Sequence, residues 1–156
     1  MSEPLLAIDQ LSIAFRQRGE TRTVVSDLSL QIAAGETLAL VGESGSGKSV
    51  TALSVLRLLP SPPVIWPQGD IRFHGQSLLH ADEPTLRGIR GNRIAMIFQA
   101  PTVSLNPLHH LETQLYAVLS LPRGMRRSAA RGAILDSLHR ARTRTAPTRL
   151  AGLPPL

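Results

Sequence analysis

The sequence predicts an α/β fold organised around one glycine-rich loop. Thr37–Val41 is a short, continuous apolar run, which is typical of a strand buried on both faces of a parallel sheet. The loop Gly42–Gly47 follows it directly, and Lys48–Leu59 then carries apolar residues at the spacing of one helix face. A strand, a loop and a helix in immediate succession therefore predict a compact unit at the centre of the fold.

Two strands are expected before this unit. Leu5–Phe15 is mostly apolar and partly alternating, and Val24–Ile32 places Leu28, Leu30 and Ile32 on one face. The polar residues between these two segments predict a turn, and so does the Ala-Gly-Glu sequence that follows the second one.

Shorter elements are expected after the unit. Pro60, Pro62 and Pro63 end the predicted helix, because proline lacks an amide hydrogen and clashes with the preceding turn. Beyond them we expect a strand at Asp70–Phe73, a helix at Glu83–Arg90, a buried strand at Ile94–Phe98, and helices at Leu111–Leu119 and Arg126–His139.

The composition is that of one globular domain. The chain has 156 residues, of which 42% are hydrophobic and 3% aromatic, so Leu, Ile, Val and Ala must form most of the core. The chain has no cysteine, which excludes disulfides and thiolate metal sites. Its first residues do not resemble a secretion signal, and it has no run of about 18 apolar residues, so we expect it to meet a membrane only through partners.

The positive charge is confined to the C-terminal part. The net charge is +6, and residues 122–149 hold eight arginines and one acidic residue, so the remainder is close to neutral. Nucleic-acid binding is one interpretation of such a stretch, and it predicts salt-sensitive DNA binding that survives Lys48→Ala. The stretch has no interleaved aromatic residues, so we favour a solvated helix face and expect no nucleic-acid partner.

The glycine-rich loop matches the pattern G-x-x-x-x-G-K-[ST] in full. Glycines and small residues let successive amide groups point inward at phosphates, and the helix that starts there adds its partial positive charge. The lysine provides a mobile charge for the β and γ phosphates, and the last hydroxyl can ligate Mg²⁺. The predicted nucleotide-binding residues of this loop are Gly42, Glu43, Ser44, Gly45, Ser46, Gly47, Lys48 and Ser49.

The base is expected to be adenine. A GTPase needs an Asn-Lys-x-Asp segment to recognise guanine, and Lys48 is the only lysine in the chain. The expected ligands are therefore ATP and Mg²⁺.

Three blocks of sequence carry a resemblance to a known family. They are Leu28–Leu53, Asp70–Gly75 and Ile94–Pro107, and the last contains the string Phe-Gln-x-Pro-x-x-Ser-Leu-Asn-Pro. Together they resemble the ATP-binding subunits of bacterial ABC importers of the oligopeptide, dipeptide and microcin C type. The resemblance implies a P-loop NTPase fold, that of an ABC-type nucleotide-binding domain, truncated and with an antiparallel β portion.

The resemblance also implies roles for two residues outside the loop. Phe15 corresponds to the aromatic residue that stacks on adenine, with a core strand residue as the alternative. Gln99 corresponds to the glutamine that contacts Mg²⁺ and the attacking water and links the nucleotide to a transmembrane partner; a polar residue at a strand end is the alternative. The next residue is Ala100, where the family usually has an acid.

Other parts of the family pattern are absent. No segment after Gln99 matches the signature motif, the Mg²⁺-binding aspartate, the catalytic glutamate or the switch histidine. We therefore name no catalytic residue, and hydrolysis by this chain alone is not expected. Asp82–Thr85 imitates the end of the missing catalytic strand, but its position favours the capped start of a short helix. His109 and His110 have no acidic partner at ligand spacing, so no metal site is expected there.

The same likeness implies the setting of the protein. Residues 1–140 are expected to be the N-terminal part of an ABC ATP-binding domain, and 141–156 an irregular tail that follows a shift of the reading frame. The implied partners are transmembrane permease subunits and a second ATP-binding domain, at the cytoplasmic face of the cell membrane. The alternative is a truncation product that is either non-functional or binds nucleotide without transport or hydrolysis. In this class of fold, the strands beside Thr37–Val41 are expected to come mostly from the missing half. Its apolar edges would therefore be unpaired, and we expect the isolated chain to be marginally stable.

Overall fold

The structure is a computed structural model that describes residues 3–99, 105–143, 145–152 and 154. It consists of two compact units, Met1–Ile94 and Ala95–Leu156. Each unit is described by itself below.

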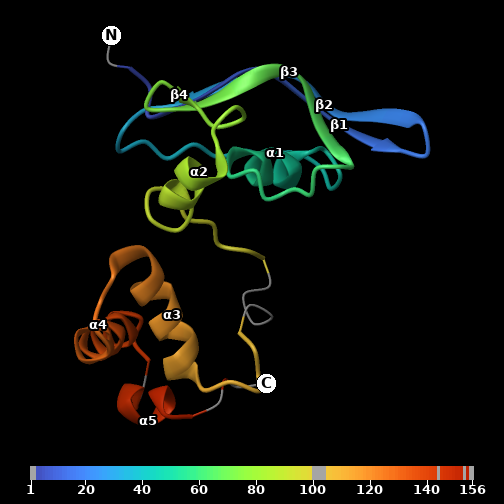
Figure 1. Ribbon diagram of the computed structural model, residues 1–156. Coiled ribbons are helices and arrows are strands. Elements are labelled where there is room, and N and C mark those ends of the chain that lie inside the picture. The colour runs from blue at the N-terminus through green and yellow to red at the C-terminus, as the bar shows by residue number, and fades with distance from the viewer. Residues whose placement is uncertain (1–2, 100–104, 144, 153, 155–156) are drawn as a thin grey trace. The chain divides into compact units, whose positions relative to one another are not determined.

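The first unit is built on an antiparallel sheet with the strand order β2-β1-β3-β4 (Figure 1). This confirms the antiparallel portion and the first two predicted strands, whereas the strand predicted at Asp70–Phe73 begins earlier, at Val64. The strands are β1 (Leu6–Gln17), β2 (Glu20–Ile32), β3 (Val64–Phe73) and β4 (Gln76–Ser77). Both β1 and β2 extend further toward their shared turn than the sequence predicted, since the turn is only two residues long.

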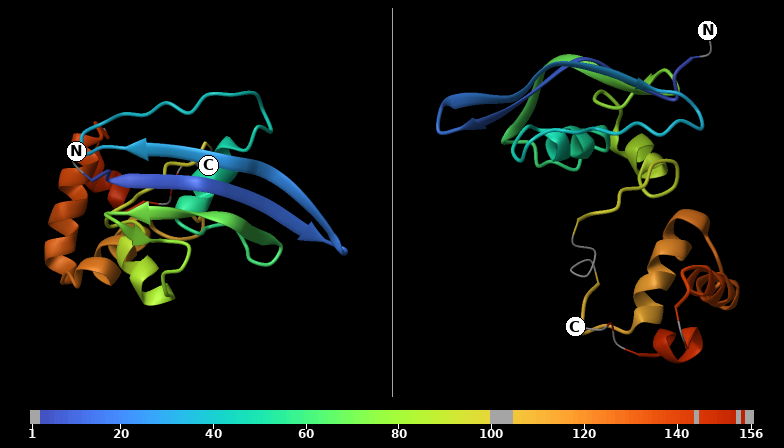
Figure 2. Two further views of the ribbon diagram at one scale, coloured as in Figure 1. Left: turned by 90° about the horizontal axis from the view of Figure 1, so that it is seen from above. Right: turned by 180° about the vertical axis from the view of Figure 1, so that it is seen from behind.

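The three long strands lie side by side and are bent, as Figure 2 shows from above. The ladder between β1 and β3 shifts register between Asp9 and Ser12. Gly69 of β3 lies opposite this irregularity with φ +83, and a Cβ atom there would overlap the backbone of Asp9 and Gln10. The bend therefore depends on a glycine at position 69.

One face of this sheet is covered by α1 (Lys48–Val55) (Figure 1). Leu11, Ile13 and Val64 are fully buried in the core of this unit. The indole Nε1 of Trp66 donates a hydrogen bond of 3.0 Å to Oγ of Ser54, which is itself fully buried, and this bond ties β3 to α1.

The helix α2 (Glu83–Ile89) begins where the sequence predicted. The Asp82 carboxylate accepts a hydrogen bond of 3.0 Å from the Thr85 amide, so Asp82 is the N-cap of this helix. Arg90 joins the ends of the two helices, because its Nε donates to the Leu56 carbonyl at 2.9 Å and its Nη1 to Oε1 of Glu83 at 2.7 Å.

Three predictions about local structure are wrong. Thr37–Val41 and Ile94–Phe98 are not buried strands: Val41 is 85% exposed and Ile97 92%. A strand needs neighbours, and the described residues provide neither segment with a sheet to join. The helix after the loop ends at Val55 rather than Leu59, because Arg57 adopts φ 48, which a right-handed helix excludes.

The second unit is helical and comprises α3 (Leu111–Arg123), α4 (Arg127–Arg140) and α5 (Ala146–Leu150). The first two confirm the predicted helices. A salt bridge of 3.4 Å from Arg131 to Glu112 joins α4 to α3. None of the helices in the described part of the chain has the length and apolar character needed to cross a bilayer.

The segment expected to be an irregular tail contains α5. Ala146 and Leu150 are buried, and the amide of Leu111 donates to the Gly152 carbonyl at 3.0 Å. Two apolar residues four positions apart are enough to bury one helical turn, which is too short to show as periodicity. The domain boundary at 140 and the shifted reading frame stay predictions.

Candidate functional site

The glycine-rich loop forms an open turn that leads into the N-terminus of α1. Gly45 and Gly47 have φ values of +81 and +90, a region that residues with a Cβ rarely adopt. A Cβ on Gly47 would also lie 2.6 Å from Cγ2 of Val25 and 3.1 Å from the Val24 carbonyl oxygen. The loop thus contacts β2 closely at the residue that caps the helix.

The ammonium group of Lys48 is held inside this loop. It donates hydrogen bonds to the carbonyl oxygens of Gly42 at 2.6 Å and Glu43 at 2.5 Å, and to Oγ of Ser46 at 3.0 Å. The two carbonyl bonds fix the charge at the mouth of the loop. The third bond goes to a hydroxyl that can rotate away, so that hydrogen can be redirected to a ligand oxygen.

The space beside the Lys48 ammonium is open because residue 42 is a glycine. A Cβ on Gly42 would lie 2.8 Å from Oγ of Ser46 and 3.7 Å from Nζ of Lys48. The amide of Ser46 donates to the Glu43 carbonyl at 3.2 Å and closes the turn. A small loop with a fixed positive charge suits an anion of phosphate size.

The start of α1 adds to the attraction for an anion. No side chain caps the helix at Gly47, and no acidic residue lies in its first turn. The first amide groups of the helix therefore have no competing acceptor from a cap and point toward the loop. Ser49 is exposed in the same turn, so its hydroxyl is accessible to a cation bound with the phosphates.

The loop rests on an apolar base. A hollow of about 170 Å³ lies beneath it, lined on one side by Val25 and Leu28 of β2 and on the other by Leu40 and Val41. Val25 also makes the close approach to Gly47, so the position of the loop depends on the sheet.

Phe15 lies in a second hollow, of about 310 Å³, further along the same strands. It pairs with Arg22 of β2 and with Val64 of β3, and its side chain is half-buried. The residues that line the hollow are Phe15, Gln17, Glu20, Arg22 and Val24. Val24 lines this hollow and Val25, the next residue of β2, lines the hollow beneath the loop, so the two hollows are neighbours along β2. The structure therefore brings Phe15 and the loop into one region.

Gln99 is exposed and belongs to the second unit. Its predicted position beside Ser49 stays a prediction, and Ala100 lies outside the described residues. Within the described part of the chain, no group of three or more His, Asp or Glu side chains can hold a metal ion.

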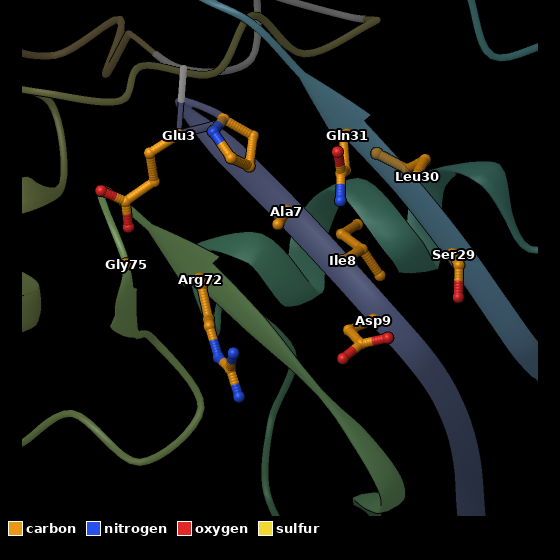
Figure 3. A pocket seen from close by; sticks show the side chains of 10 residues that line it. Glu3, Ala7, Ile8, Asp9, Ser29, Leu30, Gln31, Arg72 and Gly75 are labelled. Carbon is orange, nitrogen blue, oxygen red and sulfur yellow. The ribbon is translucent and has the colours of Figure 1, made fainter. Parts of the chain in front are cut away.

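A further hollow of the first unit lies at the other end of β1 and has a different character (Figure 3). It has a volume of about 540 Å³ and carries the carboxylates of Glu3 and Asp9. Its cation, Arg72, forms a salt bridge of 3.2 Å with Asp70. The unpaired charge of this hollow is negative, so it disfavours an anionic ligand, and the glycine-rich loop remains the candidate site.

The sequence did not single out Arg22 as a member of the site. The two-residue turn at Arg18 and Gly19 sets the register of the hairpin, and that register places Arg22 opposite Phe15. A sequence-based assignment of the turn to residues 18–19 would have given this pairing.

Comparisons with known proteins identify a family for this chain. The family described as ABC transporter matches residues 25–152. The uncharacterized ABC transporter ATP-binding protein YejF of Escherichia coli (strain K12) is 70% identical over 154 residues, which cover 99% of this chain and 29% of that protein. The peptidoglycan transport ATP-binding protein YejF of Agrobacterium fabrum is 46% identical over 98% of this chain and 28% of its own length. The chain thus spans less than a third of these two relatives.

A more distant relative and a solved structure extend the likeness. The oligopeptide transport ATP-binding protein OppD of Bacillus subtilis is 37% identical over 86% of this chain and 37% of its own length. The dimeric ATP-binding cassette MJ0796, bound to ADP and Pi, matches with a TM-score of 0.77 at 23% identity, over 96% of this chain and 61% of that one. At this identity the match shows the fold alone.

Proposed function

The chain belongs to the ABC transporter family, and from that premise we propose that its first unit binds ATP with Mg²⁺ at Gly42–Ser49. The observation that carries the proposal is the Lys48 ammonium, which two loop carbonyls hold in front of the helix start. A triphosphate would accept the hydrogen bond that now goes to Ser46, together with the first amides of α1. The chain would act as the ATP-binding subunit of a peptide-type ABC importer.

Each part of the nucleotide has a place in this proposal. The β and γ phosphates would lie in the loop, against Lys48 and the first amides of α1. The adenine would stack on Phe15, whose half-buried ring lines the neighbouring hollow. Ser49 would ligate Mg²⁺, and Gln99 would join it as a further ligand in the assembled transporter. The ion would neutralise phosphate charge.

The solute and the partners are proposed from the relatives. Their names refer to peptidoglycan transport and oligopeptide transport, so we expect a peptide or a peptide-containing solute. The proposed partners are transmembrane permease subunits and a second ATP-binding domain, at the cytoplasmic face of the cell membrane. Contact with the membrane would pass through the permease, and no nucleic acid is involved.

A second candidate function is nucleotide binding without transport or hydrolysis. One observation favours it for this chain taken alone: Leu40 and Val41, beside the loop, are 44% and 85% exposed. Apolar side chains at that position need cover from polypeptide that the described residues do not provide. Retention of the chain by a permease would separate the two candidates.

The test is the affinity for Mg-ATP of the full chain and of Lys48→Ala, with turnover measured in parallel. Loss of a charge-assisted hydrogen-bond donor costs about 1.5–3 kcal/mol, which is roughly a 10- to 100-fold loss of affinity. Arg87→Ala is the matched control, because it removes one positive charge from an exposed side chain of the same unit. An equal affinity of wild type and Lys48→Ala would refute the proposal.

A further inference from the structure

The hollow beside Phe15 contains a cationic side chain that the phosphate loop does not use. Arg22 lies directly across the β1–β2 ladder from Phe15, and both residues line the hollow. Residues that oppose each other on antiparallel strands share one face, with Cβ atoms about 4.5–5.5 Å apart. The ring and the guanidinium therefore start from adjacent points on the same side of the hairpin.

The guanidinium of Arg22 has no hydrogen-bond or ion-pair partner among the described residues. Two other arginines of the first unit are engaged: Arg57 donates to the Ala81 carbonyl at 2.7 Å, and Arg90 donates to Leu56 and Glu83. The N–H donors of the Arg22 guanidinium and its planar face are therefore available to a ligand.

The order of residues along β2 determines which part of a nucleotide reaches Arg22. The Val24 carbonyl oxygen lies 3.1 Å from the position that a Cβ on Gly47 would take at the start of α1, so a ligand with its phosphates in the loop meets Val24 first. Two residues further along the strand it meets Arg22 and Phe15. The residues at the hairpin end, Gln17 and Glu20, come last. The phosphates are then at one end of this path and the base at the other.

We propose that Arg22 is a positioning residue for the nucleotide base, and that its guanidinium plane lies against a base stacked on Phe15. This inference rests on the proposed function of the loop. A guanidinium is planar and weakly hydrated, and it stacks on aromatic faces. Glu20 lines the same hollow, and its carboxylate disfavours a phosphate there, so the base is the part that Arg22 contacts. Because every base has a π face, this contact adds affinity without selecting between purines.

The experiment compares two ligands that differ only in the nucleoside. Binding of Mg-ATP and of inorganic Mg-tripolyphosphate is measured for wild type, Arg22→Ala, Arg16→Ala and Lys48→Ala, with the fold of each checked by circular dichroism. Arg16 is the matched control, because it lies on the same hairpin, has the same charge and does not line the hollow. Lys48→Ala is expected to weaken both ligands.

Arg22→Ala is expected to weaken Mg-ATP by about 3- to 30-fold and to leave tripolyphosphate within about twofold, while Arg16→Ala leaves both unchanged. An equal loss for both ligands would show that Arg22 binds phosphate, and unchanged ATP affinity would show that it binds nothing. Either result overturns the inference while the proposed function stands. If wild type binds neither ligand, the proposed function fails first.

A conservative variant separates stacking from charge. Arg22→Lys keeps the positive charge and loses the plane, so its ATP affinity is expected to stay closer to that of Arg22→Ala than to wild type. Full recovery by lysine would overturn the stacking arrangement. ATP and GTP are expected to respond to Arg22→Ala by the same factor, and a selective loss of one would mean that the guanidinium recognises a base edge instead.

Discussion

Substitution of Gly47 by alanine tests the contact between the phosphate loop and the sheet. Two costs are expected. The left-handed backbone at φ +90 is unfavourable for alanine by about 1–2 kcal/mol. The new Cβ would also lie 2.6 Å from Cγ2 of Val25 and 3.1 Å from the Val24 carbonyl, and overpacking of this kind costs about 1–3 kcal/mol. Together the free energy of unfolding should fall by about 2–5 kcal/mol.

Gly45 provides a matched control in the same loop. Its φ is +81, and a Cβ there has nothing within 4 Å. Gly45→Ala should therefore lower the free energy of unfolding only by the cost of the left-handed backbone, about 1–2 kcal/mol. The difference between the two variants isolates the steric contact with β2.

The assay is urea unfolding followed by far-UV circular dichroism, with both variants measured at one temperature. If Gly47→Ala is too unstable to measure, Gly47→Ala combined with Val25→Ala removes the nearer obstacle and should recover part of the loss. Equal destabilisation by Gly45→Ala and Gly47→Ala would refute the close approach, and with it the link between the loop and β2.

Two further predictions concern the contacts that hold the first unit together. Trp66→Phe leaves the buried Ser54 hydroxyl without its donor, so stability should fall by about 1–3 kcal/mol; in a double-mutant cycle with Ser54→Ala, additive losses would contradict the hydrogen bond. The pKa of the Asp82 carboxyl is lowered from 3.8 by hydrogen bonds from the Thr85 side chain and then from its amide, so its stabilising effect is present above pH 3.8 and is lost as the pH falls through the lower folded value. Asp82→Ala should thus lower the melting temperature near neutral pH and progressively less in acid, whereas Asp82→Asn keeps the cap and removes the titration; a constant difference between Asp82→Ala and wild type at every pH would contradict this.

Local signals were sufficient for part of the fold. The hairpin of β1 and β2, the glycine-rich loop and the start of α2 are specified by residues that lie close together in the sequence. The Asp82 cap and its helix are predictable for that reason, since the whole interaction spans four residues. The loop is predictable because its chemistry fixes both residue types and spacing.

Features that depend on distant contacts were not predictable. Nothing near Gly69 in the sequence indicates that it faces an irregular stretch of β1, because the two segments are about 60 residues apart. The early end of α1 depends on the backbone of Arg57, which is held where its guanidinium donates to the Ala81 carbonyl. Arg22 differs from these two features: its position opposite Phe15 follows from the local two-residue turn, and it was overlooked because the turn was not assigned to residues 18–19.

Thr37–Val41 shows why an apolar run predicts burial only where a partner exists. Its sequence suits a strand with a neighbour on each side, yet Leu38 and Leu40 are 43% and 44% exposed. The solved cassette of the same fold has further chain beyond the part that matches, since the match covers 61% of it. The run and the phosphate loop are continuous in sequence, so whatever polypeptide covers Leu38 and Leu40 also holds the base of the loop. The stability of this segment and the affinity for phosphate are therefore coupled. Polypeptide that buries Leu38 and Leu40 should strengthen nucleotide binding even though it does not contact the nucleotide.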